Sequence, residues 1–299
     1  MKLIRFGRGK DANAIVRKNS SVLDKLAMKG TLQTGFRTNY IFKSVLFCII
    51  FTGLLVVFSF LKSFLPEKTE RLAYGTIGTG AAFLTTYLFL RFERKKFADI
   101  GLRFERTTIN KFFIGVLIGI VLMGLMSVGV IFFSGFKVEV NKNGNFLNFL
   151  LLTLPLVPLA FMEEIGFRAY PLITLKEKAG IRTSIIVTSL LFALYHVVNG
   201  WTVANSFLGA GVWGVVFGLS AIHSNGIAMP TGLHYAANLT TSAFGISVNP
   251  SAIWILTQND GSSLEGYQAS PEATLIPSVS LLIFGIICMG LFLRNKNYR

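Results

Sequence analysis

Long apolar runs, separated by short polar segments, dominate the hydropathy pattern of this chain. The runs come close to the roughly 17 to 25 residues that a helix needs to cross the hydrocarbon core of a bilayer. The predicted spans are Tyr40–Leu61, Tyr74–Phe92, Phe112–Phe133, Phe146–Met162, Thr183–Val198, Val203–Ile222, Ile227–Ile246 and Leu275–Leu293. The pattern predicts an all-α fold, a polytopic membrane bundle of about eight transmembrane helices.

The composition agrees with a membrane protein. The 299 residues are 52% hydrophobic and 14% charged, whereas about a quarter of a soluble domain is charged. We expect a basic cytoplasmic N-terminal tail at residues 1–39, a transmembrane domain at 40–293 and a cytoplasmic C-terminal tail at 294–299. Cys48 and Cys288 both fall inside predicted spans, so no disulfide framework is indicated.

The basic residues indicate a topology. The net charge is +15, which raises the question of nucleic-acid binding. However, 23 Lys and Arg lie in the two tails and the alternate loops on one side, and 5 lie on the other side, with Lys43 at the edge of the first span left aside. This loop-by-loop bias follows the positive-inside rule. It predicts an integral protein of the plasma (cell inner) membrane with both termini in the cytoplasm, and no nucleic-acid partner.

Proline and glycine refine the predicted helices. An unbroken helix from Phe146 to Lys176 would be roughly 45 Å long, which exceeds the bilayer core, and Pro155, Pro158 and Pro171 are placed to interrupt it. The third span is rich in glycine, which is typical of closely packed membrane helices. Residues 247–273 form the longest predicted outer loop, and we expect an ordinary loop there, including Ala252–Leu256.

Three polar clusters interrupt the apolar runs: Glu163–Arg168, Phe192–His196 and His234–Asn238. An ionisable side chain at bilayer depth costs at least a few kcal/mol, so such residues are candidates for a functional site. Measured along their helices, the clusters reach comparable depths. They predict a polar cavity inside the bundle.

Helix geometry predicts different roles for the two glutamates of the first cluster. Glu164 and Arg168 are four residues apart, share one helix face and can form an ion pair. Glu163 is rotated about 100° from Glu164 and has no cation on its own face. A carboxylate without a local cation suits a general base, whereas an ordinary ion pair at a helix end would leave Glu163 unused.

The two histidine clusters are weaker when each is taken alone. A single histidine on an apolar helix, such as His196 one turn after Phe192, is usually a core residue. His234 and Asn238 are one turn apart on one face, and their N–H groups can point to one place, as an oxyanion hole requires. A hydrogen-bonded pair between two helices has the same pattern.

Taken together and in this order, the clusters resemble the CPBP family of intramembrane proteases. This family includes the type II CAAX prenyl endopeptidases and bacterial homologues linked to bacteriocin self-immunity. Its pattern is E-E-x-x-x-R, then F-x-x-x-H, then H-x-x-x-N. The resemblance also includes Arg168-Ala169-Tyr170 and Ile100-Gly101-Leu102, and it covers a predicted catalytic core at about 97–246.

The resemblance implies an intramembrane endopeptidase that acts on a peptide or a membrane-anchored protein. It implies that Glu163 and His196 activate the attacking water, and that His234 and Asn238 stabilise the oxyanion. Glu164, Arg168 and Phe192 would support the site. No cofactor is favoured, although a zinc-dependent variant would use Glu163, His196 and His234 as ligands.

Two other classes of function fit parts of the pattern. A transporter or channel would spread polar residues over several helices and show internal symmetry, and the sequence has neither feature. A catalytically idle scaffold or a bacteriocin self-immunity protein of the same fold would keep the motifs and bind a peptide or partner without hydrolysis.

The predicted topology can be tested with reporter fusions. Fusions after Lys142 and Glu265 should report the outer side of the membrane, because the loops that contain them are poor in Lys and Arg. Fusions after Lys96, Lys178 and Arg299 should report the inner side. An outer location for Lys96 would overturn the topology.

Overall fold

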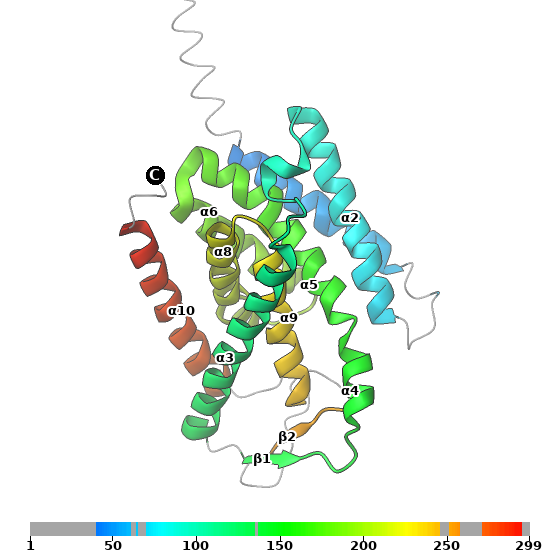
Figure 1. The fold of residues 1–299 in the computed structure, drawn as a ribbon, viewed down its shortest axis with the longest axis vertical. Helices are drawn as coiled ribbons and strands as arrows, with labels where there is room; N and C mark the ends of the chain where they lie inside the picture. Colours follow the sequence, from blue (N-terminus) through cyan, green and yellow to red (C-terminus); the bar gives the residue numbers. More distant parts are fainter. Residues whose placement is uncertain are drawn as a thin grey trace, which may run out of the picture. The chain divides into compact units, whose positions relative to one another are not determined.

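The computed structural model describes residues 40–60, 64, 70–134, 137–245, 251–257 and 271–294. The chain divides into two compact units, Met1–Lys43 and Ser44–Arg299. The predicted tails, residues 1–39 and 294–299, therefore lie outside the described ranges except for residue 294. Most described residues are helical, as Figure 1 shows.

A helix lies over each of the eight predicted spans. In chain order the elements are the helix Tyr40–Phe60, α2 (Glu70–Glu93), the 3₁₀ turn η2 (Phe97–Ile100), α3 (Thr108–Ser134), β1 (Lys137–Val140), α4 (Phe146–Thr153), α5 (Leu156–Glu164), the π-helical turn η3 (Ile165–Ala169), α6 (Tyr170–Val198), α7 (Val203–Asn205), the π-helical turn η4 (Ser206–Gly211), α8 (Val212–Ser224), α9 (Ala228–Ala243), β2 (Trp254–Thr257) and α10 (Pro271–Arg294).

Four helical stretches among the described residues are long and apolar enough to cross a membrane. They are Tyr40–Phe60, Thr108–Gly129, Phe146–Val198 and Val203–Ser224. The predicted all-α membrane bundle agrees with this finding, whereas the count of eight spans stays a prediction.

The outer surface of α3 shows why the fold belongs in lipid. Phe113, Leu117 and Leu125 are 62%, 64% and 67% exposed. In water such a row of apolar side chains would form a patch larger than a soluble monomer usually exposes. Together with the apolar helices, this surface identifies an integral membrane protein.

The long fourth span is interrupted, as the prolines predicted. α4 ends at Thr153, and Pro155 is the N-cap of α5. Pro158 lies in the first turn of α5, where a missing N–H costs no helical hydrogen bond. Pro171 follows the wide turn η3. A further kink inside α6 occurs at Gly180, whose φ of 84° is rare for other residues.

A two-stranded sheet corrects the prediction of an ordinary loop at Ala252–Leu256. β1 and β2 pair antiparallel from Lys137 opposite Thr257 to Val140 opposite Trp254. The Trp254 ring stacks on Phe244 with 5.0 Å between centroids. β1 and β2 lie more than a hundred residues apart in the chain, so no local pattern reveals their pairing. The β-branched and aromatic residues of both strands favour extended structure once they are paired.

Close packing of α3 on α9 places the third polar cluster. Glycines occupy the positions where the two backbones meet. A Cβ on Gly115 would overlap the Met229 carbonyl, and one on Gly232 would overlap the Phe112 carbonyl. Gly119 also faces α9, whereas Gly124 has no described atom within reach of a Cβ. Gly129 likewise has no described atom near a Cβ, so the predicted packing role is correct for Gly115 and Gly119 and not for Gly124 and Gly129.

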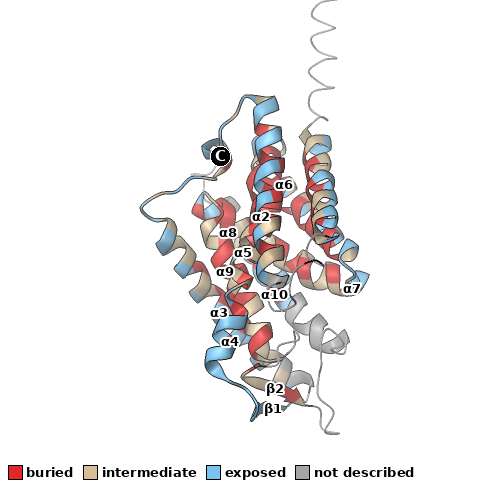
Figure 2. Cartoon of the chain, turned by 90° about the vertical axis from the view of Figure 1, so that its right-hand side faces the viewer, coloured by how far each residue is buried: buried red, intermediate tan, exposed pale blue. Residues whose placement is uncertain are grey.

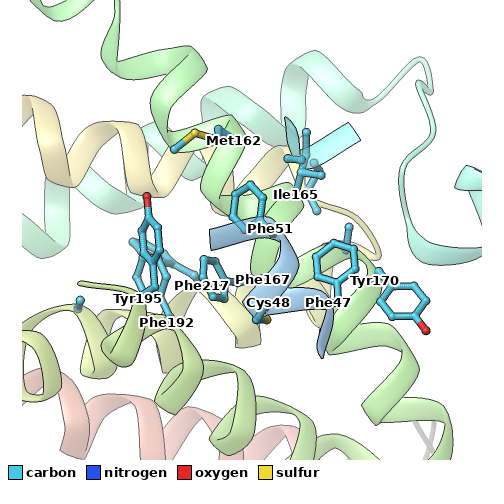
Figure 3. Packing of buried hydrophobic residues seen from close by; sticks show 14 of the residues in the cluster. Phe47, Cys48, Phe51, Met162, Ile165, Phe167, Tyr170, Phe192, Tyr195 and Phe217 are labelled. Atoms are coloured by element: carbon cyan, nitrogen blue, oxygen red, sulfur yellow. The ribbon is translucent and has the colours of Figure 1, made fainter. Parts of the chain in front are cut away.

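The interior is aromatic. Figure 3 shows Phe47, Phe51, Phe167, Phe192 and Tyr195 as members of one buried hydrophobic cluster. Phe47 and Tyr170 stack with 5.1 Å between ring centroids, and Phe51 meets the Phe167 ring edge-on at 5.9 Å. Buried residues also gather on α5, α8 and α9 (Figure 2). These three helices carry or flank the polar clusters.

The α3–α9 contact predicts a difference between two glycines of one helix. Gly115→Ala should lower the stability of the fold by about 1–3 kcal/mol, because an added methyl group meets rigid backbone. Gly124→Ala is the matched control and should be neutral or slightly stabilising. Thermal unfolding of both variants in detergent measures the difference. Equal midpoints would contradict this account of the contact.

Candidate active site

The segment that carries the first cluster is almost fully buried. Every residue from Met162 to Leu172 is buried, although the segment includes two carboxylates and a guanidinium. Gly166 makes room for the neighbouring helix Tyr40–Phe60, because a Cβ there would overlap the Phe51 ring. The π-helical turn η3 spans this contact and contains Arg168. Turns of this kind are frequent at functional sites.

A buried ion pair joins Glu164 and Arg168, as their spacing predicted. The Arg168 Nη1 lies 3.5 Å from Glu164 Oε1, and both side chains are 0% exposed. This burial corrects one point of the topology argument. Arg168 counts among the basic residues of a predicted cytoplasmic loop, yet it is a core residue of the bundle.

Aromatic rings cover the guanidinium of Arg168. Its Cζ lies 4.1 Å from the centroid of Phe192 and 5.2 Å from that of Phe217. No hydrogen-bond partner for the guanidinium nitrogens occurs in the part of the chain that the structure describes. The faces of the two rings, together with the Glu164 carboxylate, therefore compensate for much of the charge that burial removes from water.

Both carboxylates of the first cluster meet the same imidazole. His234 Nδ1 lies 2.9 Å from Glu164 Oε1, which is a hydrogen bond, and Nε2 lies 3.6 Å from Glu163 Oε2. Sequence reasoning left Glu163 without a cation because it considered only the helix that carries Glu163. α9 places His234 between the two carboxylates, which reach it from different sides of the α5 helix end.

One carboxylate oxygen of Glu163 accepts no hydrogen bond from the described residues. The Tyr195 hydroxyl lies 3.5 Å from Glu163 Oε1, at the limit of a hydrogen bond. Glu163 Oε2 is buried and has no hydrogen-bond partner among the described residues. At 3.6 Å the contact between this oxygen and His234 Nε2 is too long for a direct hydrogen bond. One water could bridge both atoms.

The hydrogen bond of His196 defines which of its ring nitrogens carries the hydrogen. Its Nδ1 lies 2.9 Å from the Phe192 carbonyl oxygen, one helical turn earlier. A carbonyl only accepts, so Nδ1 carries the hydrogen and the neutral ring has its lone pair at Nε2. The ring packs edge-on against Phe192 and Trp201, each with 4.5 Å between centroids. His196 is thus held in the tautomer that accepts a proton at Nε2.

Phe192 and Phe217 join the clusters physically. Phe192 touches the Arg168 guanidinium and the His196 ring, and its centroid lies 6.0 Å from that of His234. The Phe217 ring stacks on His234 at 4.5 Å with an angle of 16° between the planes. The structure therefore brings Glu163, Glu164, Arg168, Phe192, His196 and His234 into one group.

Asn238 stands one turn beyond His234 on α9 and is half-buried. Its backbone carbonyl accepts a hydrogen bond from the Thr241 hydroxyl at 2.9 Å. No described side chain of the group hydrogen-bonds to its amide. The spacing puts His234 and Asn238 on the same face of α9, as the oxyanion prediction requires. Whether their N–H groups bind an oxyanion stays a prediction.

Two residues of the site escaped sequence reasoning. Tyr195, 3% exposed, offers its hydroxyl to Glu163, and Phe217, 2% exposed, stacks on His234. Tyr195 is the neighbour of His196 within a quoted motif, so its polar hydroxyl was a usable signal. Phe217 gave no signal in the sequence, because a phenylalanine in an apolar run cannot be distinguished from other core residues.

The possible zinc ligands do not converge. Within the described ranges, no three or more His, Cys, Asp or Glu side chains are grouped so as to hold a metal ion. Glu163 and His234 approach each other, but both nitrogens of His234 face carboxylates. The residues as they stand do not fit the proposed His₂Glu set, and no step below passes through a metal.

Comparison with known protein families identifies the segment that carries the motifs. Residues 143–240 match the model of the family described as Type II CAAX prenyl endopeptidase Rce1-like. The match covers all three clusters and confirms the resemblance noted from the sequence. It supports a membrane protease of the CAAX type. A search of curated proteins finds no significant match to this chain.

The buried ion pair predicts that Glu164 is needed for folding. Glu164→Gln leaves Arg168 buried beside a neutral amide and replaces the charged acceptor of His234 Nδ1 with a neutral one. Breaking a buried pair typically costs about 3–5 kcal/mol. We therefore expect loss of folded protein, measured by size-exclusion profile and thermal midpoint in detergent.

The matched control for this variant is Glu177→Gln, which removes a half-exposed surface pair with Lys95. That change should cost at most about 1 kcal/mol. If Glu164→Gln is as stable as Glu177→Gln, the ion pair does not support the fold.

Proposed function

We propose that this protein is an intramembrane endopeptidase that hydrolyses a peptide bond at the group of Glu163, His196, His234 and Asn238. The observation that carries the proposal is that two buried carboxylates, of which only Glu164 is paired with Arg168, both reach His234, while Phe192 packs His196 beside the same group. The family match supports the reaction class.

The proposed general base is Glu163, assisted by His196. Both present acceptors, since Glu163 Oε2 has no described hydrogen-bond partner and the hydrogen of His196 lies on Nδ1. The Tyr195 hydroxyl and His234 Nε2 lie beside the Glu163 carboxylate, at 3.5 Å and 3.6 Å from its two oxygens. A base positioned in this way contributes roughly 10²- to 10⁴-fold to the rate of proton transfer reactions.

The chemical steps balance without a cofactor. A water loses a proton to Glu163 as its oxygen attacks the scissile carbonyl carbon, which forms a tetrahedral oxyanion. In the second step the C–N bond breaks, and the leaving amine takes the proton from the Glu163 carboxylic acid. The products are a carboxylic acid and an amine, and transfer of the acid proton to the amine leaves a carboxylate and an ammonium group.

The oxyanion donors in this proposal are His234 and Asn238. Asn238 is free to donate, because its side-chain amide has no hydrogen bond within the described residues. His234 Nδ1 donates to Glu164, so donation to an oxyanion has to come from Nε2 and requires a hydrogen on both ring nitrogens. The stacked Phe217 ring fixes the plane of the imidazole. Glu164, which pairs with Arg168, holds the opposite side of the ring through the hydrogen bond to Nδ1.

The proposal includes the cellular setting. The chain would cross the plasma membrane eight times with both termini in the cytoplasm, and its substrate would be a peptide or a membrane-anchored protein. The bias of Lys and Arg between alternate loops supports this arrangement.

Glu163→Gln should abolish hydrolysis and leave the fold intact. Glu163 has no ion pair with a Lys or Arg among the described residues, so a neutral amide of the same size costs little stability. Loss of an essential base lowers the rate by about 10²- to 10⁴-fold. Quantitative proteomics of new peptide termini in membranes should find termini that depend on the wild type and are missing with the variant.

Glu177→Gln again provides the control and should keep all wild-type termini. A scaffold or self-immunity protein of this fold would tolerate Glu163→Gln, so an unchanged cellular phenotype with this variant would contradict the enzymatic proposal.

Elemental analysis decides between this mechanism and the zinc-dependent alternative. The metal-free mechanism predicts an active purified wild type that contains no stoichiometric zinc and resists chelators. The zinc mechanism predicts near-stoichiometric metal that is lost in His234→Ala and kept in Asn238→Ala, because only the histidine would be a ligand. That second pattern would overturn the proposal.

A further inference from the structure

A pocket of about 260 Å³ lies next to the catalytic helices but away from their carboxylates. It is formed by α2, the segment after η2, the first turns of α3 and α9, and α5. The residues that matter for its chemistry are Phe83, Phe97, Phe161, Arg103, Glu105 and Lys111. The function proposed above uses none of them.

One part of the pocket is aromatic. The Phe83 ring meets the Phe97 ring at 6.0 Å and the Phe161 ring at 6.1 Å between centroids. Phe83 remains 37% exposed. Three phenyl rings that face an accessible space form an apolar surface suited to hydrocarbon.

The other part is charged, with an excess of cations. The Glu105 carboxylate pairs with Arg103 at 2.5 Å and with Lys111 at 3.0 Å. The hydrogen bond from Lys111 lowers the pKa of Glu105, so this carboxyl stays ionised near neutral pH. Two cations then share one anion, and the cluster keeps one uncompensated positive charge.

The pocket lies where an apolar helix begins. α3 starts at Thr108, which lines the pocket, and continues into the exposed apolar surface of Phe113 and Leu117. The segment before α3 adds Arg94, Lys96 and Arg106 to the basic residues nearby. A polar end followed by a lipid-facing surface is the environment of a phospholipid at the membrane–water boundary.

We propose that this pocket binds an anionic phospholipid, with the phosphate between Arg103 and Lys111 and the first acyl methylenes on the three phenyl rings. Charge complementarity favours an anionic headgroup over a zwitterionic one. The volume is below that of sites for whole drug-sized ligands, so the acyl chains would continue along α3 into the bilayer.

Such a lipid would contact both helices of the candidate active site. Phe161 precedes Glu163 by two residues on α5, and Ile227 and Ala228 of the pocket lead into α9, which carries His234. A bound lipid would therefore brace α5 against α9. The binding itself does not depend on the proposed protease function.

Titration of the purified full-length protein in detergent tests the proposal, with phosphatidylglycerol and phosphatidylcholine of equal chain length as probes and native mass spectrometry as the readout. Wild type should bind phosphatidylglycerol at least tenfold more tightly. Arg103→Ala with Lys111→Ala should remove this preference, because each charge-assisted contact is worth about tenfold in affinity. Lys96→Ala with Arg106→Ala, two basic residues that do not line the pocket, is the control and should keep the preference.

A second variant keeps the test decisive if the double variant does not fold. Glu105→Gln frees both cations and should strengthen phosphatidylglycerol binding severalfold, whereas a purely structural role for Glu105 predicts no gain. Equal binding of both lipids by wild type would overturn the proposal. Competition by glycerol phosphate as strong as that by the lipid would also overturn it, since the ligand would then be a soluble phosphate.

Discussion

The buried contact among Glu164, Arg168 and His234 is the interaction on which the rest of the site depends. It holds α9 against the end of α5, since His234 Nδ1 lies 2.9 Å from Glu164 while Arg168 pairs with the same oxygen at 3.5 Å. Removing charges from water costs several kcal/mol per ion. The fold offsets this cost with a counter-ion, a hydrogen bond and the faces of Phe192 and Phe217. Without that combination, a guanidinium would not be stable in the centre of an apolar bundle.

The same contact explains how two adjacent glutamates acquire different chemistry. Glu164 has its charge taken up by Arg168 and His234, so its role is structural. Glu163 contacts this network only through Tyr195 at 3.5 Å and His234 at 3.6 Å, and one of its oxygens has no hydrogen bond within the described residues. The two carboxylates therefore differ in how firmly their neighbours hold them.

Sequence reasoning succeeded where the determining interaction is local. The i,i+4 spacing of Glu164 and Arg168 and the interruption at Pro155 follow from the geometry of one helix. It could not reveal that His234, 70 residues from Glu164, sits between both carboxylates. It also missed the β1–β2 pairing and the part played by Phe217, because these arise from packing between distant elements. The all-α membrane fold and the contacts within one helix were thus predictable, whereas the contacts between distant elements were not.

The membrane itself constrains where such a site can be built. In lipid, irregular backbone is tolerated only where protein or a water-filled cavity surrounds it. The wide turn η3 and the break at Pro155 both weaken helical hydrogen bonding, and η3 lies in the fully buried stretch from Met162 to Leu172. α3, which is regular throughout, presents its apolar side chains outward. The regular helix can therefore face lipid, and it packs on α9 through Gly115 and Gly119, so that the irregular, charged segment stays inside the bundle.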